Sequence, residues 1–161
     1  MHIKERLSIS SGFTLIELII VFTVISILST IGIASFVDYS RSQSLQSAAS
    51  DLASTLNSAK SRATSQVKPS QCLGALNGYQ VDILSDRTYS LSAYCPEARL
   101  IQTITLPDNG NIKFDLGLGQ TTTTSVFFPI IKGGIQGAGD MALTAYGQTK
   151  TVTIDNVGNI K

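Results

Sequence analysis

The sequence predicts an α+β fold in which one long N-terminal helix packs on an antiparallel β-sheet head. Three observations predict it: a long apolar run that begins at Phe13, a stripe of apolar residues at helical spacing, and strand-like alternation after Cys72. Because no proline precedes Pro69, the run and the stripe can belong to one continuous helix. We therefore divide the chain, in order, into a leader, an apolar half-helix, an amphipathic half-helix and a β-rich head: 1–12, 13–37, 38–68 and 69–161.

The apolar half-helix carries a single charge. Residues 13–37 are long enough to cross a hydrocarbon core of roughly 30 Å, which takes about 20 helical residues. Lys4 and Arg6 precede the run, so the positive-inside bias places the leader in the cytoplasm. Glu17 costs roughly 2.5–3.5 kcal/mol in hydrocarbon. We therefore expect a specific partner for its carboxylate, with snorkelling to the headgroups as the alternative.

Residues 12–17 read GFTLIE, and between a polar leader and an apolar run they resemble the N-terminus of type IV prepilins. The resemblance implies the type IV pilin fold, cleavage by a prepilin peptidase between Gly12 and Phe13, and N-methylation of Phe13. It also implies that Glu17 pairs with the Phe13 amine of a neighbouring subunit and sets the register of a filament. The spacing suits such a pair, since residues four apart lie one helical turn apart.

Two other interpretations explain this segment less well. An ordinary secretory signal would be cleaved near residues 32–34, but its apolar region is roughly 7–15 residues long. The present run is longer and contains Glu17. A plain membrane anchor would explain the apolar run but not residues 12–17.

The second half of the helix is predicted to be amphipathic. Its apolar residues are spaced three and four apart on one face, namely Leu45, Ala49, Leu52, Leu56, Ala59 and Ala63. The small alanines favour close packing on a sheet. A coiled-coil seam is the alternative, but sustained heptads and flanking charges are missing. The helix should end before Pro69, because proline disfavours helix in the residue before it.

The head is predicted to be built from short strands. The expected strands are 79–84 and 88–94, which form a hairpin, and 101–106, 111–116, 125–131, 142–145 and 149–154. Turns are expected at 108–111 and 155–158, and a flexible loop at 133–139.

Cys72 and Cys95 flank the predicted hairpin. Outside the cytoplasm such a pair is usually oxidised, so we expect a disulfide, with two free thiols or a partial metal site as alternatives. A bridge over this loop would contribute on the order of 3 kcal/mol on chain-entropy grounds. We expect no metal and no cofactor, because there is no second cysteine pair and the only histidine, His2, lies in the leader.

Shorter stretches resemble the FimT/GspH family of minor pilins and pseudopilins. They are residues 52–63 at the helix end, 78–81 at the first hairpin and 152–160 near the C-terminus. Two positions depart from that family's pattern, since Lys60 stands where arginine is expected and Asn159 where a basic residue is usual.

Charge gives little support to nucleic-acid binding. The chain carries 12 basic and 11 acidic side chains, and loss of Lys4, Glu5 and Arg6 with the leader leaves no net charge. Phosphate backbones are bound through excess Lys and Arg. Lys60, Arg62 and Lys68 form a modest cluster at the helix end, which we interpret as a solvated helix face.

Catalysis has no support in the residues. Without His2 the mature chain has no Ser–His or Cys–His pair. Asp82 and Asp86 lie at a predicted hairpin turn, where aspartate serves the backbone. The oxygen-rich residues of 108–111 do not have the spacing of an EF-hand loop, so a plain turn is expected there.

We therefore expect a non-enzymatic structural subunit of a type IV pilus-like filament, as a minor pilin or pseudopilin. It would first lie in the bacterial inner membrane with its N-terminus in the cytoplasm, and then in an extracytoplasmic or cell-surface filament. Expected partners are other pilin subunits, the prepilin peptidase, and the assembly platform of a pilus or of type II secretion. Alternatives are a type II secretion pseudopilin, a major pilin, a DNA-uptake minor pilin, and a monomeric anchored domain that binds a ligand through residues 133–139.

Overall fold

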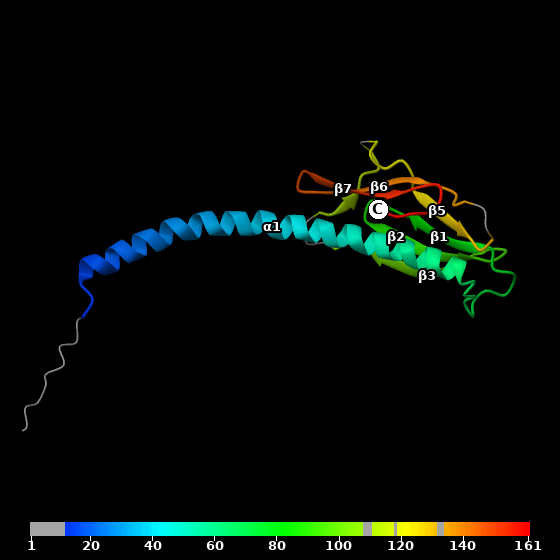
Figure 1. The fold of residues 1–161 in the computed structure, drawn as a ribbon, viewed down its shortest axis with the longest axis horizontal. Coiled ribbons are helices and arrows are strands. Elements are labelled where there is room, and N and C mark those ends of the chain that lie inside the picture. Colours follow the sequence, from blue (N-terminus) through cyan, green and yellow to red (C-terminus); the bar gives the residue numbers. More distant parts are fainter. Residues whose placement is uncertain (1–11, 108–110, 118, 132–133) are drawn as a thin grey trace, which may run out of the picture. The chain divides into compact units, whose positions relative to one another are not determined.

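The structure is a computed structural model that describes residues 12–107, 111–117, 119–131 and 134–161, with only the backbone at 30–32 and 34–35. The chain divides into two compact units, Met1–Tyr39 and Ser40–Lys161. Within the described residues there are one helix, α1 (Leu15–Thr64), and seven strands in two antiparallel sheets (Figure 1). The predicted α+β fold is confirmed.

The end of α1 is set by a local hydrogen-bond motif. The Gln66 N–H donates to the Ala63 carbonyl at 3.1 Å, and the Val67 N–H donates to the Arg62 carbonyl at 3.1 Å. Gln66 has a left-handed φ of 51°. This is a Schellman motif, which satisfies the last carbonyls of a helix. The helix therefore ends before the first proline, as expected, but earlier than the predicted boundary at residue 68.

The strands are divided between two sheets. The first sheet has the order β3-β2-β1-β5, and the second has the order β4-β6-β7. Their bounds are β1 (Gly78–Ile83), β2 (Thr88–Tyr94), β3 (Ala98–Thr105), β4 (Lys113–Phe114), β5 (Ser125–Pro129), β6 (Gly139–Ala145) and β7 (Gln148–Ile154). The chain thus leaves the first sheet at β4, returns to it at β5, and leaves it again.

The predicted hairpin is confirmed, because β1 and β2 pair antiparallel over nearly their full lengths. The strand predicted at 111–116 is shorter than expected. Just after β4 the Asp115 N–H still donates to the Ala142 carbonyl at 2.9 Å, but the Leu116 N–H donates to the Phe114 carbonyl at 3.1 Å, so the chain turns there and the ladder ends. The turn predicted at 108–111 lies outside the described residues, apart from Asn111.

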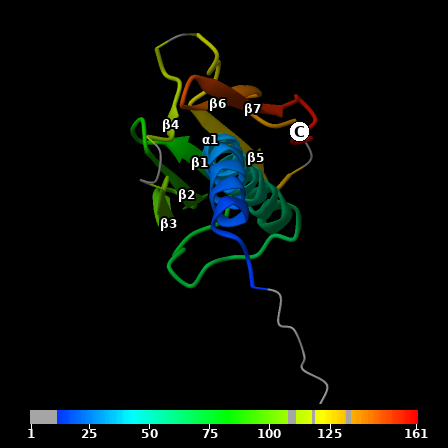
Figure 2. The same ribbon diagram turned by 90° about the vertical axis from the view of Figure 1, so that its left-hand side faces the viewer.

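The core of the second unit lies between α1 and the two sheets. All six residues of the predicted helical stripe are buried, and they share one cluster with apolar side chains of both sheets. Figure 2 shows this half of α1 against the strands. The Tyr89 ring of the first sheet meets the Phe114 ring of the second edge to face, with centroids 5.9 Å apart. The stripe therefore docks on the sheets, as the small alanines predicted.

Candidate functional site

The first turn of α1 places the predicted processing residues. Gly12 and Phe13 precede the helix and are exposed, Phe13 to 82%. Thr14 caps the helix, because its Oγ1 accepts the Glu17 N–H at 3.3 Å and its carbonyl accepts the Leu18 N–H at 3.2 Å. Glu17 thus lies at the third helical position, where a carboxylate is also favoured by the helix dipole.

Thr14 was missed as a site residue in the sequence. The signal was present, since Thr-x-x-Glu ahead of an apolar run is the pattern of a capping box. The cap fixes where the helix begins. Glu17 therefore lies in the first turn of the helix, four residues after Phe13.

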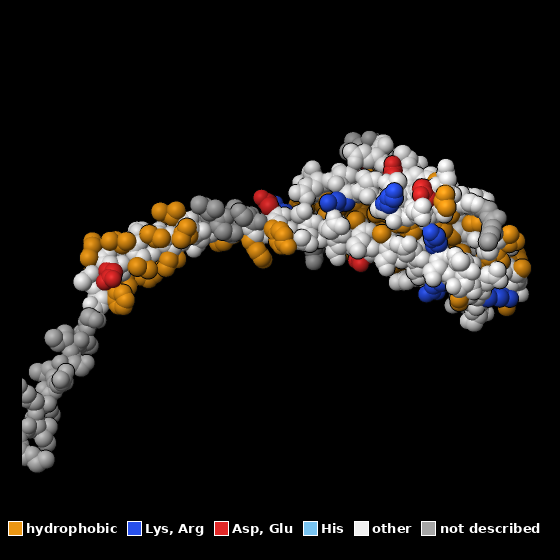
Figure 3. All heavy atoms as spheres, viewed as in Figure 1, with side chains coloured by type: hydrophobic (Ala, Val, Ile, Leu, Met, Phe, Trp, Pro, Cys, Tyr) orange, Lys and Arg blue, Asp and Glu red, His pale blue; other side chains and the backbone are white. Residues whose placement is uncertain are grey.

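The first unit presents apolar side chains to its surroundings. In the described part of this segment every large apolar side chain is exposed, and Figure 3 shows these side chains covering it. Two of its hydroxyls are satisfied within the helix, because Thr23 Oγ1 donates to the Ile20 carbonyl and Ser26 Oγ to the Phe22 carbonyl, each at 2.8 Å. This surface therefore suits apolar surroundings better than it suits water.

Within the described residues, no helix combines the length and the hydropathy needed to cross a membrane. The membrane crossing predicted for residues 13–37 is therefore not confirmed.

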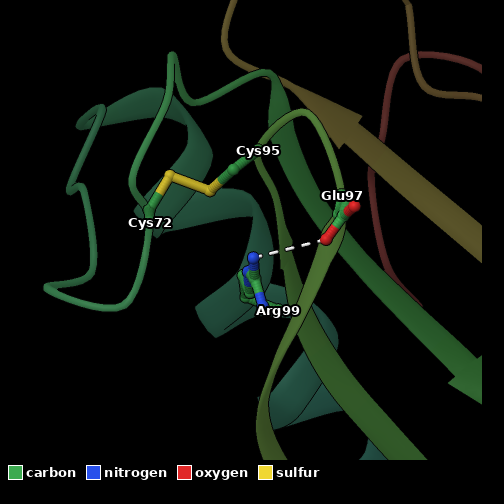
Figure 4. Close-up of polar contacts among 4 residues, drawn as sticks. All are labelled: Cys72, Cys95, Glu97 and Arg99. Carbon is green, nitrogen blue, oxygen red and sulfur yellow. Dashed lines mark hydrogen bonds and ion pairs between the residues drawn. A yellow bond between two sulfur atoms is a disulfide. The ribbon is translucent and has the colours of Figure 1, made fainter.

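Cys72 and Cys95 form a disulfide that joins the segment after α1 to the end of β2 (Figure 4). Their Cα atoms lie 5.8 Å apart and both residues are buried. Glu97, just ahead of β3, and Arg99, near its start, form an exposed ion pair of 3.3 Å. The bridge connects the end of the helix to the first hairpin, as the sequence placement implied.

Tyr79 gives the same junction a second connection. Its hydroxyl donates to the Val67 carbonyl, just beyond the end of the helix. Burial raises the pKa of Tyr79 above its ordinary value of 10.0, against the opposing effect of the nearby Arg62 guanidinium. Tyr79 therefore stays a neutral donor at physiological pH.

Lys60 joins the helix to the C-terminal turn. Its Nζ donates to the Gly158 carbonyl at 2.8 Å. In that turn Asp155 Oδ1 accepts the N–H groups of Val157 at 2.9 Å and Asn159 at 2.8 Å. These bonds, first among them the one from the Asn159 backbone, lower the pKa of Asp155. The predicted turn is confirmed. Lys60 is half-buried in this contact, whereas Arg62 and Lys68 are exposed, so the solvated helix face expected for the three holds only for the latter two.

The acidic residues of the head have backbone and side-chain roles. Asp82 accepts the Gln80 amide at 2.8 Å, and the Asp86 carbonyl accepts the Phe114 N–H. Among the described residues no three His, Cys, Asp or Glu side chains cluster as metal ligands.

Comparison with known families gives a match for the N-terminal segment. The family described as the prokaryotic N-terminal methylation motif matches residues 7–33. No curated protein and no solved structure matches the chain. The FimT/GspH resemblance therefore stays a proposal.

The motif belongs to structural subunits rather than to enzymes, and it implies processing by a prepilin peptidase and assembly with other pilin subunits. It also points to a membrane-anchored precursor of a surface filament. The helix and antiparallel sheets are consistent with the type IV pilin fold. The methylation motif at residues 7–33 thus supports recognition of the chain as a type IV pilin-like prepilin.

Proposed function

We propose that the chain is a subunit of a type IV pilus-like filament, assembled from the inner membrane after cleavage between Gly12 and Phe13 and methylation of Phe13. The methylation motif at residues 7–33 is the observation that carries the proposal. The exposed apolar surface of the first unit supports it. In a filament, neighbouring helices would cover this surface.

Glu17 would supply the register of assembly. Moving an apolar helix from lipid into a bundle of apolar helices changes its surroundings little, so apolar burial alone does not choose one position along the axis. A carboxylate in apolar surroundings is costly unless it is paired. Pairing of Glu17 with the Phe13 ammonium of a neighbour would satisfy both charges at one relative position only.

Within this class we propose a minor pilin or pseudopilin of the FimT/GspH kind. Two of the stretches that resemble this family, 52–63 and 152–160, contact each other through the hydrogen bond from Lys60 to the Gly158 carbonyl. The two stretches thus meet in the folded head, and this contact supports treating them as one family feature rather than as two unrelated matches. A major pilin and a DNA-uptake pilin are the alternatives that subunit abundance and a transformation assay would distinguish.

The register role predicts a separation between processing and assembly. Glu17→Ala should be cleaved at Gly12 and retained in the membrane, yet be absent from sheared filaments, because the Phe13 amine of its neighbour has no partner. The matched control is Glu97→Ala, which removes an exposed carboxylate of the head. Mass spectrometry of the membrane and filament fractions reads both the mature N-terminus and the amount. Wild-type incorporation of Glu17→Ala would refute the pairing.

The same measurement on wild-type filaments tests the class. A trace component that begins at Phe13 fits the minor-subunit proposal. A dominant component would make the chain a major pilin, and an uncleaved N-terminus in a strain with active prepilin peptidase would overturn the filament proposal.

A further inference from the structure

A hollow of about 520 Å³ lies on the face of the first sheet opposite the core, because its lining residue Gln80 alternates along β1 with the buried Tyr79 and Val81. Its floor comes from β1, β2 and β5, and one wall comes from the segment that follows β5. This volume is within the roughly 300–1,000 Å³ of small-ligand sites. We call it the sheet groove, and its polar lining consists of Asn77, Gln80, Ser125 and Gln136.

The wall of the sheet groove is held by backbone contacts. The Phe127 N–H donates to the Gln136 carbonyl at 2.9 Å, and the Gln136 N–H returns a bond to the Phe127 carbonyl at 3.1 Å. Gly137 follows with a φ of 83°, and a Cβ there would lie 2.0 Å from the Ser125 carbonyl oxygen. Only glycine permits this approach. The side chain of Gln136 is therefore presented from a fixed backbone.

The aromatic part of the sheet groove is equally constrained. The rings of Tyr94 and Phe127 meet at 78°, with centroids 5.7 Å apart. The Phe127 ring lies across Gly78, where a Cβ would come within 2.5 Å of its Cζ. Tyr94 remains 38% exposed. An aromatic surface is thus kept open beside the polar groups.

Gln80 is oriented before any ligand arrives. Its Nε2 donates to Asp82 Oδ1 at 2.8 Å and to Ser125 Oγ at 3.0 Å. Both amide hydrogens are used, so the carboxamide offers its oxygen as an acceptor. Asn77 and Gln136 are exposed and bring further groups that both donate and accept.

We propose that the sheet groove binds a neutral saccharide. Carboxamides and a hydroxyl match the alternating donors and acceptors of sugar hydroxyls. Aromatic ring faces carry partial negative charge, which attracts the C–H groups on the apolar face of a sugar ring. The lining has no charged side chain, whereas nucleic acid needs Lys or Arg against its phosphates. The groove is lined wholly by residues of the second unit, outside the methylation motif at residues 7–33.

The test uses the full chain in a detergent without a sugar headgroup. The probe is an array of neutral glycans that end in glucose, galactose, mannose or N-acetylglucosamine, followed by titration of the strongest binder. Gln136→Ala and Tyr94→Ala should each weaken binding about tenfold, which corresponds to about 1.4 kcal/mol. The matched control is Gln148→Ala, an exposed glutamine of β7 outside the groove, which should change the Kd less than about twofold.

Circular dichroism of each variant establishes that the head is folded, and Gln136→Ala keeps the backbone pair with Phe127 even if Tyr94→Ala does not fold. Three results would overturn the proposal. They are no neutral glycan bound at millimolar concentration, binding that Gln136→Ala leaves intact, and preference for acidic glycans or DNA.

Discussion

Leu56→Ala tests whether the helical stripe carries the stability of the head. Leu56 is 0% exposed and belongs to the core shared by α1 and both sheets. Removing three carbon atoms at roughly 0.8 kcal/mol each loses about 2.4 kcal/mol of transfer free energy. The cavity left between a helix and two sheets raises the expected loss to about 3–4 kcal/mol, within the roughly 2.7–5.0 kcal/mol observed for buried leucines.

The loss is measured by urea unfolding of the full chain in detergent. Near-ultraviolet circular dichroism follows the buried rings of Tyr79 and Tyr89. Ser54→Ala is the matched control, because Ser54 is exposed on the same helix and its replacement should change stability by less than about 0.5 kcal/mol. If Leu56→Ala costs no more than this control, the stripe does not hold the head together and the docking argument fails.

Two further predictions concern the head. Replacing Cys72 and Cys95 together by serine should lower the unfolding free energy by about 3 kcal/mol, since the bridge spans a sequence separation of 23 residues, and an unchanged urea midpoint would contradict this. Asp155 has a pKa below its ordinary 3.8, so its stabilising contribution is present above that pH and is lost as the pH falls through the lowered value. Asp155→Asn should therefore make the melting temperature depend less on pH below about pH 4. An unchanged dependence on pH would show that the hydrogen bonds of the turn do not depend on the charge of Asp155.

Much of the helix could be predicted from the sequence because local pattern decides it. The three-and-four spacing from Leu45 to Ala63 marks the buried face whatever it packs on. Residues 12–17 likewise predict a processing site through residue identity alone.

The end of the helix and the division of the strands were not predictable in the same way. Gln66 takes a left-handed backbone conformation at the helix end, and this position is usually occupied by glycine. Strand pairing is non-local, so nothing near Lys113 or Ser125 indicates that the first joins one sheet and the second the other. The sheet groove was missed for the same reason, although part of its wall falls in the loop at 133–139 that was considered for ligand binding.

The path of the chain between the sheets has a kinetic consequence. Strands β1, β2 and β3 are neighbours in sequence and can pair early. Strand β5 pairs with β1, with Pro129 beside Gly78, but it is separated from these strands in sequence by β4 of the other sheet. The chain loses the entropy of closing this long loop before the contacts between β5 and β1 can stabilise it. This step should therefore limit the folding rate. The disulfide shortens that loop only slightly, because Cys95 still lies far ahead of β5 along the chain. Until β5 pairs with it, one edge of β1 is open to pairing with another chain, and such an open edge favours aggregation.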